Sequence, residues 1–161
     1  MQKFSTFKTK LKRLNEQQNV LRPQNSDEFG GDVEKSDVAK FISKLFEARE
    51  MAHVFHLQVN GDVGTHAIHT ALGEFYESLL GFIDELTEVY QGQYGLVENY
   101  DVIDTSSARE RQYIPYFESL SEFIKSNRQT AFNNEDTHLQ NIIDEIVAIN
   151  YRLLYKLKFN K

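Results

Sequence analysis

The fold is decided by residues 65–91, which read THAIHTALGEFYESLLGFIDELTEVYQ. Large apolar residues recur here at alternating spacings of four and three, at Ile68, Leu72, Phe75, Leu79, Phe82, Leu86 and Val89. This spacing keeps one apolar stripe on a single side of an α-helix and predicts a helix that packs along its whole length. At 1.5 Å per residue, such a helix is roughly 40 Å long. We expect Gly92 and Gly95 to end it.

A second helix of the same kind is predicted just before this one. Its apolar residues repeat the same alternation, at Val38, Phe41, Leu45, Ala48, Ala52, Phe55 and Val59. Ser36 is a good N-cap for this helix, and Asn60-Gly61 suits its end. Because only residues 60–64 separate the two helices, we expect an antiparallel hairpin.

Two further helices are predicted after a long connection. Residues 92–112 are rich in turn formers, with one helical turn expected near 106–111, and a connection of about twenty residues suits a crossover between parallel helices. Pro115 suits the start of the third helix, and Asn133-Asn134 suits its end. The third and fourth apolar stripes are Phe117, Leu120, Ile124 and Ala131, then Leu139, Ile143, Ile146, Leu153 and Leu157. Since no segment alternates polar and apolar residues for long, we predict an all-α four-helix bundle with a long crossover between the second and third helices.

Composition limits the classes of protein that remain. The 161 residues suit one bundle, at 36–161, preceded by a polar, Gly-containing linker and N-terminal arm at 1–35. Cysteine is absent, which excludes disulfides, thiol catalysis and zinc-thiolate sites. No apolar run is long enough to cross a membrane, and the N-terminus lacks the apolar stretch of a signal peptide. We therefore expect a cytoplasmic protein with no membrane association.

The N-terminal arm is basic, whereas the rest of the chain is acidic. Residues 1–22 hold six basic residues and one acidic residue, a charge of +5, and the remaining 12 basic and 23 acidic residues give −11. Such an arm either binds nucleic acid or an acidic partner, or remains a solvated tail. The residues that would make such contacts are Lys3, Lys8, Lys10, Lys12 and Arg13.

Four of the five histidines gather around the first hairpin, at His53, His56, His66 and His69. A histidine on an apolar helix face is more often a structural residue than a ligand, but clustering favours metal binding because imidazole is the commonest metal ligand. The register of the apolar stripes places His56 and His69 beside the packing lines and directs His53 and His66 further outward. The inner pair are the better candidate ligands.

A second contact face is predicted on the helix at 65–91. Asp84 and Glu88 are four residues apart, so their carboxylates project from one side of the helix. We place Gly73, Leu80 and Gly81 on that side, where small residues beside an exposed leucine suit close approach by another helix.

His69 and Asp84 cannot hold the same ion within one chain. Fifteen residues separate them by roughly 22 Å along the helix axis but by only about 60° around it. If two copies pair antiparallel about a two-fold axis near Tyr76–Glu77, His69 of one copy meets Asp84 of the other. The pair would then contain two identical sites.

The stretch that holds these residues resembles Dps-like ferritins. It reads His56-Leu-Gln-Val-Asn-Gly, Thr65-His-Ala-Ile-His69, then Asp84-Glu-Leu-Thr-Glu88. In that family, one histidine ends the first helix, a second begins the next, and an Asp-x-x-x-Glu pair follows fifteen residues later. Ala71-Leu72, Phe75-Tyr76 and the run Tyr90-Gln-Gly-Gln-Tyr-Gly95 are also similar to small ferritin-like proteins encoded by bacteriophages.

This resemblance implies a ferritin-like fold and a metal site at a two-fold interface. Its ligands would be His56 and His69 of one subunit with Asp84 and Glu88 of the other, and the implied activity is oxidation and storage of iron within a cage of subunits. Zinc and manganese would suit the same ligands. The sequence departs from the family pattern at Leu57, where a Trp is usual, and at Gly73, where an Asp is usual. Additional candidate ligands are Glu74, His53 and His66.

Two other functions remain open at this point. The chain resembles phage-encoded proteins, so one alternative is a virion or assembly component that keeps the ferritin-like fold without iron oxidation and docks through its basic arm. Its location would be the host cytoplasm or the virion. The other alternative is a protein that compacts nucleic acid with residues 3–22, as some Dps-like proteins do with a lysine-rich arm.

Overall fold

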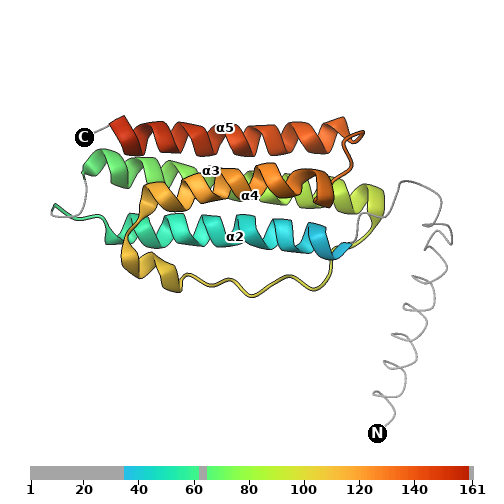
Figure 1. Ribbon diagram of the computed structural model, residues 1–161, viewed down its shortest axis with the longest axis horizontal. Coiled ribbons are helices and arrows are strands. Elements are labelled where there is room, and N and C mark those ends of the chain that lie inside the picture. Colours follow the sequence, from blue (N-terminus) through green and yellow to red (C-terminus); the bar gives the residue numbers. More distant parts are fainter. Residues whose placement is uncertain (1–34, 62–64, 160–161) are drawn as a thin grey trace, which may run out of the picture. The chain divides into compact units, whose positions relative to one another are not determined.

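The computed structural model describes residues 35–61 and 65–159. These residues form α2 (Lys35–Gln58), α3 (His66–Tyr94), the short 3-10 helix η1 (Ser106–Glu110), α4 (Tyr113–Ala131) and α5 (Thr137–Phe159), as Figure 1 shows. They contain no β-strand, which confirms the all-α prediction for this part of the chain. The arm residues Lys3, Lys8, Lys10, Lys12 and Arg13, and the linker up to residue 34, lie outside the described residues.

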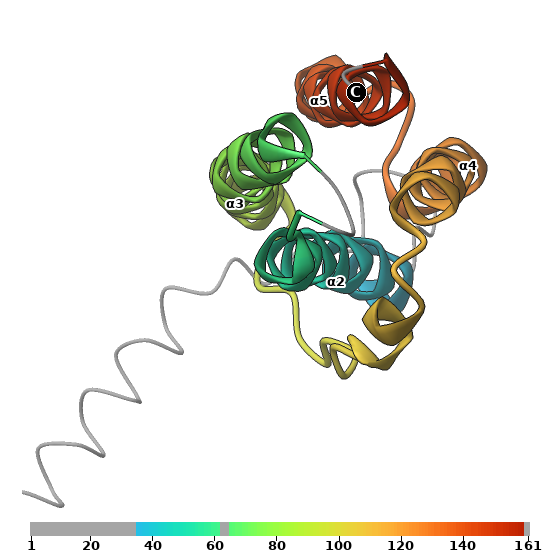
Figure 2. The ribbon, with the colours of Figure 1, turned by 90° about the vertical axis from the view of Figure 1, so that its left-hand side faces the viewer.

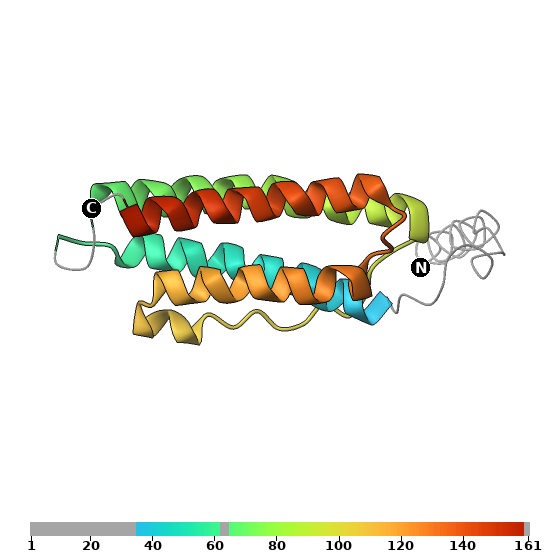
Figure 3. The ribbon, with the colours of Figure 1, turned by 45° about the horizontal axis from the view of Figure 1, so that its top comes forward.

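The four long helices of the described region pack side by side. Seen end on, they stand at the corners of a square in the order α2, α3, α5, α4, and each contacts its two neighbours in that order (Figure 2). The hairpins α2–α3 and α4–α5 are antiparallel, and the diagonal helices α3 and α4 run in the same direction (Figures 1 and 3). The α2–α3 side and the α4–α5 side are therefore opposite sides of the square.

The connection between α3 and α4 runs back along the outside of α2. The backbone N–H of Asp101 donates to Ser43 Oγ at 2.9 Å, and the ring of Tyr100 packs edge-on against Phe46 at 6.4 Å between centroids. Further along, Ser107 Oγ lies 3.8 Å from the sulfur of Met51. These contacts lead from Ser43 and Phe46 to Met51 along α2, so the connection ends beside the same end of the bundle at which α3 began (Figure 3).

The apolar stripe of α3 follows the predicted positions at Leu72, Phe75, Leu79 and Leu86, but at two other positions the buried residue is the next one along. Ile83 and Tyr90 are buried, whereas Phe82 is only partly buried and Val89 is 36% exposed. A straight α-helix has 3.6 residues per turn, so a stripe that follows a seven-residue repeat drifts around it. For this reason Phe82 packs against the core only in part, and the predicted core position at Val89 was wrong.

The helix ends differ slightly from those predicted. Gly92 lies inside α3, and the helix ends at Gly95, whose φ of +83° is strained for other residues and whose N–H donates to Gln91 O at 2.9 Å. Pro115 is the third residue of α4, within the first turn, where a missing N–H breaks no helical hydrogen bond. Of the helices in the described ranges, none has the length and apolar character needed to span a membrane.

Candidate metal centre

Two histidines join the end of α2 to the start of α3 through reciprocal hydrogen bonds. His56 Nδ1 lies 2.8 Å from the backbone oxygen of His69, and His69 Nδ1 lies 3.1 Å from the backbone oxygen of His56. A carbonyl oxygen only accepts, so both Nδ1 atoms carry a proton and donate. The two rings stack with centroids 3.7 Å apart and planes 26° from parallel. We name this arrangement the histidine clasp.

The clasp fixes which nitrogen of each ring is available to a ligand. When Nδ1 of a neutral imidazole carries the proton, Nε2 carries a lone pair. Histidines that bind metals commonly donate their other ring N–H to a carbonyl or carboxylate, which sets the tautomer and orients the ring. His56 and His69 therefore both have the protonation pattern and the backbone support of metal ligands.

Gly73 provides the space in which the clasp forms. It is buried, and a Cβ atom there would lie 3.3 Å from both Cε1 and Nδ1 of His56. The prediction that placed Gly73 on the outward face with Leu80 and Gly81 was therefore wrong, because this turn of α3 faces the end of α2. Any side chain at this position, an aspartate included, would set its Cβ against the imidazole ring of His56.

The clasp is the centre of a row of four imidazoles. The His53 ring lies 6.5 Å from that of His56, and the His66 ring lies 6.3 Å from that of His69. His53 also packs against the ring of Tyr76 at 4.6 Å and is partly buried, whereas His66 is exposed. The outward direction predicted for these two residues holds for His66 alone.

A positive charge lies beside this row. The Arg49 guanidinium stands 5.7 Å from the centroid of the Tyr76 ring and forms an ion pair with Glu50. Its Nε is buried with no hydrogen-bond partner. The Glu50 carboxylate offsets this charge within the chain, so the further carboxylates of a site here would balance the metal ion itself.

The predicted acidic ligands lie elsewhere on α3. Asp84 and Glu88 are both exposed, and fifteen residues separate Asp84 from His69, roughly 22 Å along the helix. Within residues 35–61 and 65–159, no three His, Asp or Glu side chains gather closely enough to hold a metal ion. One chain thus brings together His56 and His69 but not Asp84 and Glu88.

Glu74, the nearest acid to the missing aspartate position, is already engaged. Its carboxylate forms an ion pair with Lys156 of α5. It is therefore directed toward α5 and does not complete the clasp, which lies between α2 and α3. By contrast, Leu80 is 38% exposed, and a Cβ at Gly81 would meet no atom within 4 Å. This part of α3 has the open surface that contact with another helix requires.

Comparison with known proteins places the chain in a family. Residues 56–157 match the model of a family of unknown function, DUF5856. The chain belongs to this family. No curated protein and no solved structure matches it. The DUF5856 region begins at His56 and extends into the last turn of α5, so it includes both residues of the clasp and the Asp84–Glu88 pair but not His53.

One residue beside the clasp, Tyr76, was not predicted from the sequence as part of the candidate site. Its ring contacts His53 and lies 5.5 Å from the ring of His56, edge to face. The signal was present in the spacing, because His69, Gly73 and Tyr76 follow one another at four and three residues and so share a face of α3. From the sequence, Gly73 was assigned to a contact face with Leu80 and Gly81, and Tyr76 was placed only near the proposed two-fold axis.

Proposed function

We propose that this protein binds a divalent metal ion, iron foremost, between two copies of the chain. His56 and His69 of one copy and Asp84 and Glu88 of the other would be its ligands. The single observation that carries the proposal is the pair of Nδ1–H donors in the clasp, which leaves both Nε2 lone pairs for a metal. The parallel direction of α3 and α4 and the long crossover between them support a ferritin-like assignment.

The carboxylates reach the imidazoles only if two α3 helices pair antiparallel. His69 and Asp84 are placed symmetrically about a point between Tyr76 and Glu77, so a two-fold axis there brings each histidine to the other copy's acids. The exposed Leu80 and the open space at Gly81 suit such a contact. The charges of two carboxylates would also offset the charge of the metal ion.

This mixed ligand set determines which ions the site accepts. Two neutral imidazoles and two carboxylates suit Fe(II), and they also suit zinc and manganese. Iron would be the substrate if the protein is a ferroxidase of the Dps type, since Fe(II) supplies the electron in that oxidation. The role of the chain is to bind and orient the ion, with Nε2 of His56 and His69 as donors and Asp84 and Glu88 as counter-charges.

Metal uptake by paired variants tests the proposal. Full-length protein is loaded with Fe(II) without oxygen, and its metal content is measured by mass spectrometry. We expect His56→Ala with His69→Ala to abolish uptake, and Asp84→Asn with Glu88→Gln to do the same. His138→Ala is the matched control, because its imidazole bonds Gln93 at the other end of α3.

Mixing the two double variants tests whether each site needs two copies. A mixed dimer combines the histidines of one variant with the acids of the other and so regains one complete site. We expect metal uptake to return on mixing. Unchanged metal content in either double variant, or no recovery in the mixture, would contradict the shared site.

A second candidate is a virion or assembly component that keeps the bundle without binding metal. The clasp favours it in one respect, because both Nδ1 donors are satisfied within the chain and hold the hairpin without an ion. In that case the wild-type protein takes up no metal, and the basic residues Lys3, Lys8, Lys10, Lys12 and Arg13 contact a partner or nucleic acid. Changing all five to Gln would then abolish salt-sensitive retardation of DNA; the absence of retardation at low salt would dismiss nucleic acid.

A further inference from the structure

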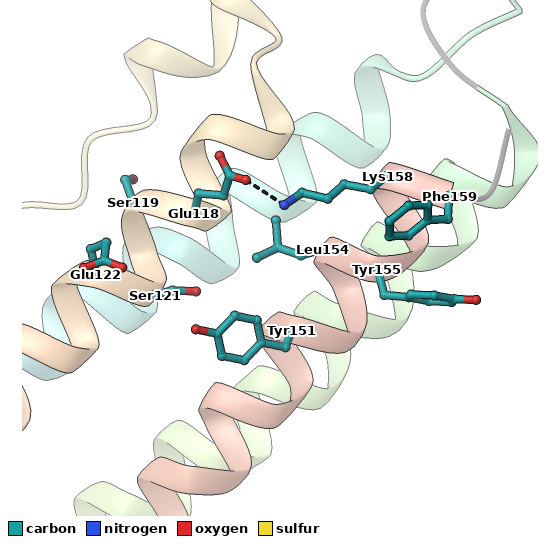
Figure 4. Close-up of a pocket in the computed structure, with 9 residues that line it drawn as sticks. All are labelled: Glu118, Ser119, Ser121, Glu122, Tyr151, Leu154, Tyr155, Lys158 and Phe159. Carbon is teal, nitrogen blue, oxygen red and sulfur yellow. Dashed lines mark hydrogen bonds and ion pairs between the residues drawn. The ribbon is translucent and has the colours of Figure 1, made fainter.

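An open groove lies between α4 and α5 (Figure 4). These two helices form the side of the bundle opposite α2 and α3, the helices that carry the clasp (Figure 2). Its volume is about 540 Å³. The side chains that line it come from both helices and are Glu118, Ser119, Ser121, Glu122, Tyr151, Leu154, Tyr155, Lys158 and Phe159.

The α5 side of the groove is aromatic and exposed. Tyr151, Tyr155 and Phe159 follow one another at intervals of four, so they share one face of the helix, and they are 57%, 62% and 67% exposed. The rings of Tyr155 and Phe159 lie 5.3 Å apart, and Tyr151 extends toward α4 (Figure 4). Clustered exposed aromatic residues are a feature of surfaces that bind other proteins.

The two rims of the groove are complementary to each other. The α4 rim carries hydrogen-bond acceptors, the carboxylates of Glu118 and Glu122, and both residues are exposed. The α5 rim carries donors, the Lys158 ammonium and the hydroxyls of Tyr151 and Tyr155. Glu118 Oε1 lies 2.7 Å from Lys158 Nζ, so these two residues stand at the same level along the groove.

We propose that the groove pairs with the same groove of a second copy, about a two-fold axis that runs along it between α4 and α5. Rotation about this axis lays α4 of each copy over α5 of the other, so acceptors face donors and Glu118 of one copy faces Lys158 of its mate. A two-fold axis that runs across the groove, from α4 to α5, would instead lay α4 of one copy over α4 of the other. It would bring the Glu118 and Glu122 carboxylates of the two copies together. The six aromatic residues, three from each copy, fill the space between the facing grooves.

The size of this face suits such a dimer. The 19 residues of α4 give it a length of roughly 28 Å, and two adjacent helices are roughly 20 Å wide. These two dimensions give the face a flat area of about 560 Å², without the unevenness that side chains add. This area approaches the roughly 800 Å² that each partner buries in a standard interface.

This pairing is independent of the proposed metal site. It uses α4 and α5, whereas the shared metal site uses the outer surface of α3. Two isologous contacts on different faces of one subunit build assemblies larger than a dimer. Loss of one contact leaves the other intact, so metal uptake and groove pairing are measured separately.

Sedimentation velocity of the full-length protein tests the pairing with Tyr155→Glu. This variant places a negative charge inside the proposed interface. We therefore expect it to weaken self-association at least tenfold. Val102→Glu is the control, because Val102 is 92% exposed on the connection that follows α3. Equal association of Tyr155→Glu and the wild type, or no association of the wild type at all, would overturn the proposal.

An exchange of charge tests the orientation. Glu118→Lys and Lys158→Glu each place like charges both within a chain and across the axis, so each variant alone should associate weakly. In an equal mixture, residues 118 and 158 of different copies again carry opposite charges, while the pairs within each chain still repel. We expect the mixture to regain association to within a few-fold of the wild type, with both variants folded by circular dichroism. Absence of recovery would reject this two-fold arrangement.

Discussion

The α2–α3 and α4–α5 hairpins are both antiparallel, but they are held together in different ways. The first is tied by the clasp, whose half-buried imidazoles lie at the edge of the bundle. The second is tied from inside by Asn150, which is fully buried and donates to Phe117 O at 2.9 Å and to Ser121 Oγ at 2.8 Å.

The two hairpins differ in whether the residues that stabilise them are also the residues proposed to bind a ligand or partner. In α2–α3, the same rings that join the helices are the candidate ligands, so changing them affects both properties. In α4–α5, the tie lies beneath the groove, and the exposed aromatic row has no part in it. The three exposed aromatic residues of α5 are therefore not needed for the tie between α4 and α5.

The largest effect is expected from Asn150→Ala. This change removes two hydrogen bonds at a fully buried position, which should lower the free energy of unfolding by about 2–3 kcal/mol. Urea denaturation measures the loss, and Asn141→Ala on the exposed side of α5 is the control, with no expected change. A loss below about 1 kcal/mol would mean that contacts other than the Asn150 hydrogen bonds hold α4 against α5.

A smaller loss, about 1–2 kcal/mol, is expected from His56→Ala in metal-free protein, because it removes one hydrogen bond of the clasp and the stacked ring. The comparison is with His66→Ala, whose exposed ring lies 6.3 Å from that of His69. Chemical denaturation in the presence of a chelator measures both variants. Equal stability of the two would show that the clasp does not hold the hairpin.

Two glycines of α3 sharpen the same comparison at a smaller scale. At Gly92 a Cβ meets no atom within 4 Å, so Gly92→Ala should stabilise the protein by about 0.5–1 kcal/mol, the usual gain of alanine over glycine inside a helix. At Gly73 the Cβ would press on a ring that the His69 carbonyl holds in place. Gly73→Ala should therefore not show the stabilisation expected for Gly92→Ala. Equal melting temperatures for the two variants would contradict the close approach at Gly73.

The smallest effect concerns Tyr94, outside both ties. Burial, followed by its 2.6 Å hydrogen bond to Asp136 Oδ2, raises the pKa of Tyr94 to about 12 from the usual 10. Since the folded state holds this proton more tightly, the unfolded state loses it first, and stability should decline as the pH rises from 10 to 12. Absorbance titration of the wild type and Tyr94→Phe measures the pKa. A phenol that titrates near 10 would contradict this account.

The sequence predicted the helices better than their contacts. Periodic spacing was sufficient to find all four long helices of the described region, because each buries an apolar stripe along its length. Phe82 and Val89 were misplaced because a small angular drift per turn accumulates over a long helix. Asn150 was overlooked because a buried polar residue interrupts the apolar pattern on which the prediction relied.

For the candidate site, too, the residues were predicted from the sequence but their contacts were not. His56 and His69 were singled out from their clustering and register, but their reciprocal bonds to backbone carbonyls depend on how α2 and α3 meet. Gly73 was misread because spacing along one helix does not reveal which neighbour covers each face. The groove had no sequence signal, since exposed and buried aromatic residues recur at the same intervals.

The clasp also has a consequence for the connection between α2 and α3. Its two hydrogen bonds cross from each helix to the backbone of the other and so set which turn of α2 stands beside which turn of α3. The alignment of the hairpin is thus specified at residues 56 and 69, upstream and downstream of the connection. A longer connection adds closure entropy that grows only with the logarithm of its length. A peptide tag or a reporter domain inserted after Gly61 would accordingly leave Val59, which packs against the core, and the N-cap Thr65 in place and should not shift one helix against the other.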